Sequence, residues 1–158
     1  MGKKTWKEKL HDSKDLPKIV ELEGKMRDKF GEGTMVIPAP LEVDEIMRKV
    51  KKGKLITING IREALAKKHG TTTACPITTG IFAWIAANAA EDERAEGKKR
   101  ITPWWRTLKG KGELNPKYPG GIEKQMELLE AEGFKVIPKG KKKFIVADYE
   151  KYLAKIQL

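Results

Sequence analysis

The sequence has little of several residue types and patterns that mark whole classes of protein. It contains one cysteine, Cys75, and two histidines among 158 residues. A single cysteine excludes an internal disulfide framework, and so few Cys and His side chains form no pattern for a metal site. No run of about 18 apolar residues occurs, which argues against a membrane span. The N-terminus lacks the apolar core of a signal peptide, so we expect a cytoplasmic protein.

Positive charge, in contrast, is in excess. The formal net charge is +11, and residues 98–143 hold 13 basic side chains against five acidic ones. A localised excess of this kind is typical of proteins that bind a polyanion such as nucleic acid. The alternative is a Lys-rich surface that only keeps the chain soluble. No basic helix with a strong apolar face occurs, which disfavours a membrane surface as the partner.

Hydrophobic spacing predicts a series of helices over the first two thirds of the chain. Residues 5–31 are predicted to form a helical arm, followed by an extended stretch at 34–40, where prolines disfavour helix. Three further helices are predicted over 41–50, from a cap at Thr57 or Asn59 to His69, and over 77–95. The last of these has Pro76 in its first turn, and its apolar face is expected to consist of Ile81, Trp84, Ile85 and Ala89.

The remaining third mixes helix and strand. An amphipathic helix is predicted over 122–132, and a hairpin with strands 134–137 and 144–147 around a polar, glycine-bearing turn. Asp148 is expected to cap a last helix. The order of elements predicts an α+β fold with a winged helix-turn-helix core. We divide the chain into a helical arm (1–40), the winged-helix domain (41–134) and a C-terminal hairpin with a helix (135–158).

Five short motifs occur in the order in which one family of DNA-repair proteins carries them. They are Val50–Thr57, Gly80 with Asn88, Pro103–Arg106, Tyr118–Gly121 and Leu128–Gly133. Residues 41–134 therefore resemble the C-terminal domain of the alkylguanine-DNA alkyltransferases. They are more similar to the alkyltransferase-like proteins, which lack the reactive cysteine. The resemblance implies a winged-helix DNA-binding domain with a pocket for an extruded base.

The departures from the family pattern bear on the chemistry. Pro103-Trp104-Trp105-Arg106 stands where alkyltransferases carry Pro-Cys-His-Arg and the alkyltransferase-like group carries Pro-Trp-His-Arg. Because an indole has no ionisable nucleophile, Trp104 excludes stoichiometric alkyl transfer at this position. Trp105 replaces the family's histidine, while Glu132 keeps the place of the carboxylate that orients that histidine. The family's intercalating arginine aligns with Ile77, which we interpret as an apolar wedge.

The resemblance implies a set of residues that contact DNA or the lesion. The helix that begins near Pro76 is expected to enter the minor groove, and the base to settle against an indole and a glycine loop. The set is Ile77, Gly80, Asn88, Pro103, Trp104, Trp105, Arg106, Tyr118, Gly120 and Gly121. The alternative is that the two tryptophans anchor the core or the wing, that Arg106 forms a salt bridge there, and that the glycines only begin the next helix.

Basic and hydroxyl side chains are expected to hold phosphates, which fixes position without reading sequence. The predicted set is Thr71, Thr72, Lys109, Lys111, Lys141 and Lys142. The alternative interpretation is a solvated turn for the lysines and a helix cap for the threonines. Cys75 and His69 are expected to be structural. We expect no catalytic residue, no cofactor and no metal.

The sequence therefore predicts a non-enzymatic protein that recognises alkylated or otherwise modified bases in double-stranded DNA by nucleotide flipping. It is expected to be a monomer, to have no membrane partner, and to hand the lesion to a repair-pathway protein. Two alternatives stay open. One is a base-processing enzyme that uses Glu132 as general base, which a raised carboxylate pKa would favour. The other is a winged-helix module for RNA or a protein partner, which an uncharged apolar face on the 77–95 helix would favour.

Overall fold

The N-terminal arm is a mixture of short helices and strands. The computed structural model describes residues 4–156. It places helix α1 at Trp6–His11, strand β1 at Lys18–Glu21, helix α2 at Gly24–Phe30 and strand β2 at Thr34–Ile37. The prediction of helix throughout 5–31 is therefore wrong at 18–21. Ile19 and Val20 are β-branched, and their strand pairs antiparallel with β2, so tertiary pairing decides their conformation.

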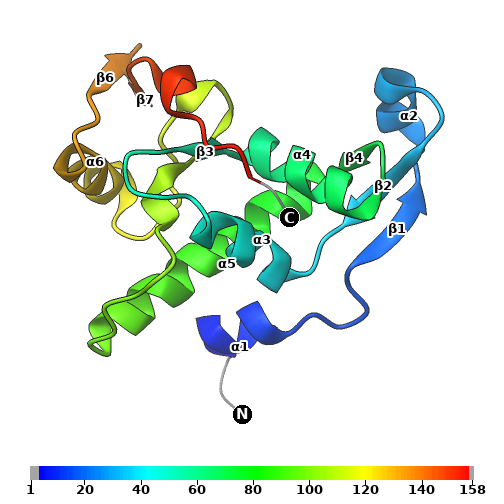
Figure 1. Cartoon of the computed structure of the whole chain (residues 1–158), viewed down its shortest axis with the longest axis horizontal. Helices are drawn as coiled ribbons and strands as arrows, with labels where there is room; N and C mark the ends of the chain where they lie inside the picture. The colour runs from blue at the N-terminus through cyan, green and yellow to red at the C-terminus, as the bar shows by residue number, and fades with distance from the viewer. Residues whose placement is uncertain (1–3, 157–158) are drawn as a thin grey trace.

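A three-stranded sheet joins this arm to the centre of the chain. Its order is β1-β2-β4, and β4 (Thr73–Ala74) pairs parallel with β2. The sheet thus joins strands from both sides of the predicted boundary at residue 40. The division of the chain at that residue stays a prediction. Helix α1 also packs on the centre of the molecule, since Leu10 is buried within the main core. Figure 1 shows the arm beside the central helices.

The central helices form the predicted helix-turn-helix arrangement. Helix α3 spans Pro40–Arg48, α4 Ile58–His69 and α5 Pro76–Ala95, with the short strand β3 (Ile56–Thr57) before α4. Thr57 is the cap: its hydroxyl accepts a hydrogen bond from the Gly60 amide at 3.1 Å. Gly70 adopts the left-handed conformation that ends α4. Small side chains of α5, among them Ala83, Ala86 and Ala90, pack in the main core.

After α5, the chain folds back and forms short 3-10 helices, a short strand, helix α6 and a hairpin. A 3-10 helix η1 (Trp104–Arg106) leads into β5 (Thr107–Leu108), which pairs parallel with β3. A second 3-10 turn η2 (Gly110–Gly112) and helix α6 (Gly121–Ala131) follow. The predicted hairpin is confirmed as β6 (Val136–Lys139) and β7 (Lys143–Val146).

The last predicted helix is only one short 3-10 turn, η3 (Tyr149–Tyr152). Asp148 precedes it in a left-handed conformation and makes no side-chain cap bond, so the predicted cap is wrong. The chain after η3 instead runs beside Leu55, whose carbonyl accepts a hydrogen bond from the Ala154 amide. Among residues 4–156, no helix is both long and apolar enough to cross a membrane.

Candidate nucleic-acid interface

The first half of α5 exposes an apolar stripe. Ile77, Ile81 and Trp84 follow one another at helical spacing, and Ile77 is 72% and Ile81 45% exposed. Of the predicted apolar face, Ile85 and Ala89 are buried, whereas Ile81 is exposed. The alanine-rich face of α5 packs inward instead, because small side chains let α3 approach closely. Ile77 and Ile81 are thereby turned toward solvent, as at a surface that meets a partner.

Gly80 makes a notch in the same stripe. A Cβ atom added at this position would meet no atom within 4 Å outside the backbone of its own helix. A glycine inside a helix costs roughly 0.5–1 kcal/mol relative to alanine, because it loses more conformational freedom on folding. Packing within the described chain therefore does not require glycine here. The glycine leaves room for a binding partner to approach the backbone of α5 closely.

The loop between β5 and α6 forms the opposite wall of a groove. The groove holds about 510 Å³ and is lined by Ile77, Gly80, Ile81, Trp84, Lys109, Asn115, Pro116 and Lys117. We call it the α5 groove. The indole nitrogen of Trp84 donates to the Lys117 carbonyl at 3.0 Å, which ties the loop to the helix. The Asn115 side chain accepts from the Lys117 amide at 2.9 Å, which shapes the turn.

Buried polar contacts hold this wall in place from behind. The side-chain oxygen of Gln125, which is fully buried, accepts from the Asn115 amide at 2.9 Å. Its nitrogen donates to the carbonyls of Trp105 and Thr107. On the other side, the ring of Trp6 packs edge-on against Trp84 at 4.7 Å between ring centroids. The width of the groove is thus set by contacts from three parts of the chain.

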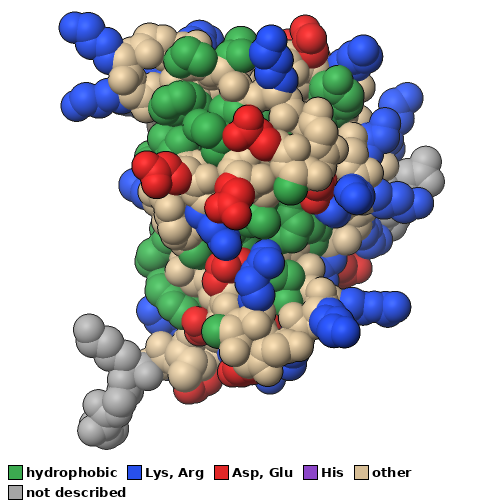
Figure 2. All heavy atoms as spheres, turned by 90° about the vertical axis from the view of Figure 1, so that its left-hand side faces the viewer, with side chains coloured by type: hydrophobic (Ala, Val, Ile, Leu, Met, Phe, Trp, Pro, Cys, Tyr) green, Lys and Arg blue, Asp and Glu red, His purple; other side chains and the backbone are tan. Residues whose placement is uncertain are grey.

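The groove has a basic rim. Lys109 and Lys117 are exposed, and neither has a carboxylate within 4 Å among the described residues. Among residues 4–156, no acidic side chain lines the groove. The side of the molecule that bears α6 and the far end of α5 differs: acidic, basic and apolar side chains are mixed in its middle, and further Lys and Arg project from its edges (Figure 2). An apolar floor with a basic rim suits a polyanion with apolar surface, as nucleic acid has.

The predicted pocket around Trp104 does not exist as an opening. Trp104 is 0% exposed, and its indole nitrogen donates to a Glu91 carboxylate oxygen at 2.9 Å. The rings of Trp105 and Tyr118 meet it edge-on at 5.9 and 5.5 Å. Tyr118 is itself buried, and this burial raises the pKa of its hydroxyl. The prediction that a base stacks on Trp104 is therefore wrong, because protein side chains already occupy its surroundings.

Trp105 and Arg106 belong to a polar cluster around Glu132. The indole nitrogen of Trp105 donates to Glu132 at 2.7 Å, so it takes the hydrogen-bonding place expected for the family's histidine. Arg106 donates to the same carboxylate through Nε and Nη2 at 2.9 and 2.8 Å, and through Nη1 to the Val50 carbonyl. These groups fix the turn before β3, which is the structural role that the alternative interpretation gave to Arg106. A contact of Trp105 or Arg106 with a base stays a prediction.

The same cluster decides against Glu132 as a general base. Partial burial alone raises its pKa, but the bonds from Arg106 and Trp105 outweigh burial and hold the pKa below its ordinary value. A general base that works near neutral pH needs a raised carboxylate pKa and a free lone pair facing a substrate. A raised pKa of Glu132 would have favoured a base-processing enzyme, whereas the pKa of Glu132 is lowered.

The other predicted lesion contacts lie away from the α5 groove. Pro103 is buried, and the Asn88 side chain donates to the Trp84 carbonyl within its own helix. Gly120 and Gly121 have positive φ and lie at the start of α6. This agrees with the alternative interpretation, in which these glycines only begin the next helix. A Cβ at Gly120 would lie 2.4 Å from Lys124, so this turn requires glycine. Of the predicted lesion set, the α5 groove contains Ile77 and Gly80.

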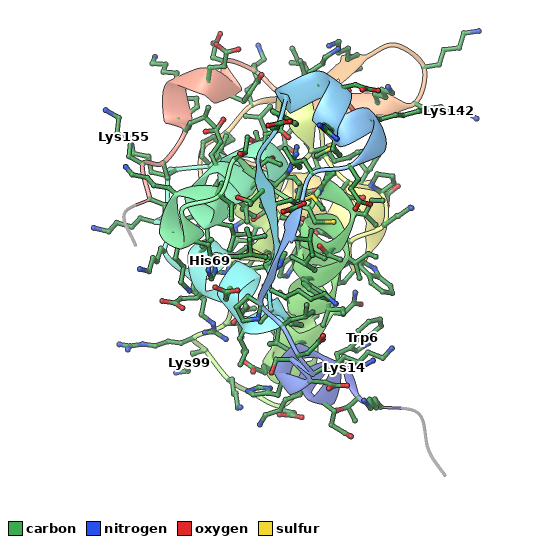
Figure 3. The ribbon with its side chains drawn as sticks, turned by 90° about the vertical axis from the view of Figure 1, so that its right-hand side faces the viewer. Trp6, Lys14, His69, Lys99, Lys142 and Lys155 are labelled. Atoms are coloured by element: carbon green, nitrogen blue, oxygen red, sulfur yellow. The ribbon has the colours of Figure 1, made fainter. Side chains whose placement is uncertain are left out.

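The predicted phosphate contacts divide into two groups. The Thr71 hydroxyl donates to the Thr73 carbonyl, and the Thr72 hydroxyl accepts from the Thr34 amide, so both serve the sheet. Lys109 lines the α5 groove, and Lys111 is exposed on the adjoining turn. Lys141 and Lys142 are exposed at the turn of the hairpin, and Lys142 points away from the body of the molecule (Figure 3). A phosphate role for these lysines stays a prediction.

Cys75 and His69 have local structural surroundings. Cys75 occupies the cap position of α5 and is partly exposed. His69 lies 2.7 Å from the Glu42 carboxylate through its Nε2 atom. Within residues 4–156, no three His, Cys, Asp or Glu side chains gather where a metal ion could bind.

Comparison with solved structures identifies the fold. Atl1 of S. pombe, an alkyltransferase-like protein solved in complex with damaged DNA containing O6-carboxymethylguanine, superposes with a TM-score of 0.51. The chain has an alkyltransferase-like fold. The superposition covers 74% of this chain and 94% of the Atl1 chain, at 17% sequence identity. The predicted α+β winged-helix class is thereby confirmed. No protein-family model matches the sequence, and no curated protein matches it.

The structure also reveals groove residues that sequence reasoning missed. Trp84, Asn115 and Lys117 meet only because the loop folds back onto α5. The sequence offered one usable signal: Ile77, Gly80, Ile81 and Trp84 lie on one helical face, at positions i, i+3, i+4 and i+7.

Proposed function

We propose that this chain is a non-catalytic protein that binds duplex DNA and recognises an alkylated or otherwise modified base. The α5 groove carries the proposal: it combines an exposed apolar stripe, a glycine notch and unpaired lysines on one surface. The fold supports it, because Atl1 has the same fold and was solved with damaged DNA. In this proposal α5 enters the minor groove, and no covalent step follows.

Ile77 is the proposed wedge. It projects from the first turn of α5 and is the most exposed of the large apolar side chains in the described chain. Apolar side chains that enter between base steps of the minor groove unstack and kink the duplex. A damaged base pair is weaker than a normal one, so it costs less to open, and this difference supplies selectivity. Ile77 thus replaces an arginine wedge with an apolar one.

The extruded base is proposed to enter the α5 groove between Ile81, Trp84 and the Asn115–Lys117 turn. The volume of the groove, about 510 Å³, lies within the range of small-molecule sites. Gly80 allows the base or its sugar to approach the helix backbone closely. The partly exposed indole of Trp84 offers an aromatic surface, and base–aromatic contacts contribute roughly 1–3 kcal/mol each. Asn115 supplies a side-chain amide beside this surface.

Lysines complete the proposed DNA contact. Lys109 and Lys117 line the groove, and Lys111 is exposed on the adjoining turn η2. We propose that these lysines bind phosphates on either side of the opened base pair. Such contacts add affinity without sequence preference and weaken as salt rises. We further propose that the protein acts as a monomer in the cytoplasm and passes the lesion to a repair protein.

A protein partner is the alternative that the apolar stripe favours. The absence of acidic groups from the groove, and its two unpaired lysines, favour DNA over a protein of ordinary surface composition. Fluorescence anisotropy tests the DNA proposal. Two duplexes of the same sequence, of which one carries a single O6-carboxymethylguanine, are titrated at several salt concentrations. We expect tighter binding of the damaged duplex at every salt concentration. Equal binding of both duplexes at every salt concentration contradicts lesion recognition.

An exposed isoleucine elsewhere provides a matched control. Ile77→Ala removes the proposed wedge, and Ile19→Ala makes the same change on β1, where Ile19 is 53% exposed. Both variants should fold normally, because neither side chain is buried. The preference for the damaged duplex should fall with Ile77→Ala and persist with Ile19→Ala. Loss of preference in both variants, or in neither, rules out Ile77 as the wedge.

A further inference from the structure

A second concave surface lies away from the α5 groove. It holds about 380 Å³ and is lined by Lys49, Lys51, Lys54, Leu153, Ala154 and Lys155. We call it the lysine patch. In Figure 3, Lys155 lies on the flank opposite Trp6, whose ring packs on Trp84 of the α5 groove. A duplex that lies along α5 therefore does not occupy this surface.

Two fixed segments bring the lysines together. The turn that carries Lys51 and Lys54 is held by Arg106, which donates to the Val50 carbonyl, and by Glu132, which accepts from the Gly53 amide. The end of η3 and the segment after it are bonded to Leu55, the residue before β3: the Leu55 amide donates to the Tyr152 carbonyl at 2.9 Å, and the Ala154 amide donates to the Leu55 carbonyl at 2.8 Å. The C-terminal segment thus places Lys155 beside the turn.

The patch concentrates positive charge on Lys51, Lys54 and Lys155. Lys51, Lys54 and Lys155 are exposed, and within residues 4–156 none has a carboxylate within 4 Å. Lys49 lies 3.9 Å from Glu45, and no acidic side chain of the described residues lines the concavity. Like charges around one concave surface raise the local potential and attract an anion.

The chemistry of the patch favours a phosphate backbone over a protein or a free base. It offers only ammonium groups and a small apolar floor, with no aromatic side chain for stacking and no arginine fork. Lysine is also depleted in the buried centre of protein–protein interfaces. We propose that the lysine patch binds the phosphate backbone of a second DNA segment, so that one chain bridges two duplexes. This site lies outside the proposed lesion-binding groove and does not depend on lesion recognition.

A two-duplex capture experiment tests the bridge. The full chain is bound to an immobilised undamaged duplex, washed, and then offered a fluorescent second duplex. We expect close to one second duplex per chain, with the protein monomeric in analytical ultracentrifugation. The variant Lys51→Glu, Lys54→Glu, Lys155→Glu should lose about tenfold or more of this capture, with a salt slope lowered by about three for the lost phosphate contacts.

The matched control reverses the same number of charges elsewhere. Lys98→Glu, Lys99→Glu, Arg100→Glu changes three exposed residues of the segment after α5 and should leave capture of the second duplex intact. Equal loss in both triple variants would reveal only diffuse attraction and overturn the proposal, as would unchanged capture by the patch variant. Lys109→Glu with Lys117→Glu separates the two proposals: it should weaken binding at the α5 groove and leave one duplex bound at the patch.

Discussion

Filling the notch at Gly80 should strengthen the fold while it weakens DNA binding. In Gly80→Leu, the new side chain leaves the helix at a point where a Cβ meets no atom within 4 Å, so the native packing is unchanged. Leucine is about as favourable as alanine inside a helix, and glycine is about 0.8–1 kcal/mol worse. We therefore expect the free energy of unfolding to rise by roughly 1 kcal/mol. For a chain of this size that is about 2–4 °C in Tm.

The same side chain should project into the α5 groove and block close approach of DNA. Affinity for the O6-carboxymethylguanine duplex is expected to fall about tenfold or more, which is 1.4 kcal/mol or more of binding free energy. Thermal unfolding followed by circular dichroism and fluorescence anisotropy measure the two effects. Ala95→Leu, at the exposed far end of α5, is the control and should leave affinity unchanged. A Gly80→Leu protein that is stabilised yet binds DNA as well as the parent would refute the reasoning.

Three further predictions concern residues that do not line the α5 groove. Trp104→Phe should lower Tm, because it leaves space in the core and breaks the hydrogen bond to Glu91. The ratio of affinities for damaged and undamaged duplex should stay unchanged. Loss of the preference for damaged duplex at unchanged Tm would instead support Trp104 as a base contact. Glu132→Gln should cost about 2 kcal/mol at neutral pH, measured by urea unfolding. Because the pKa of Glu132 is held below its ordinary value of 4.5, its contribution is complete above that pH and is lost as pH falls; the deficit of the variant should therefore shrink at pH 3, and a constant deficit contradicts the assignment. Thr57→Ala should cost about 1 kcal/mol through the lost cap of α4, and no change in Tm would contradict the cap.

The helices and the hairpin could be predicted because their signals are local. Thr57 and Gly70 bracket α4, and Pro76 starts α5. Two apolar segments on either side of a polar, glycine-bearing turn specify the hairpin. The error at 18–21 has a tertiary cause. Ile19 and Val20 fit a helical pattern, but their strand gains a partner, β2, that no local pattern reveals.

The site was harder to predict than the fold. The motifs aligned Trp104 with the position of the family's reactive cysteine, but a sequence alignment cannot reveal that Glu91 and Tyr118 close around its indole. Helical periodicity also identified Ile81 as part of an apolar face, but only the packing of the alanine face shows that Ile81 lies on the exposed side. Lys117 reaches Trp84 through a loop closure across 33 positions of sequence, which local spacing does not encode.

Nuclear magnetic resonance of the four tryptophan indole N–H groups tests the central claim most directly. The ¹⁵N-labelled chain is titrated with the duplex that contains one O6-carboxymethylguanine, and each indole signal is assigned by a Trp→Phe variant. We predict a large shift of the Trp84 indole, together with the amides of Ile77, Gly80 and Ile81, while the Trp104 indole hardly moves. A large shift at Trp104 with none at Trp84 would contradict the account.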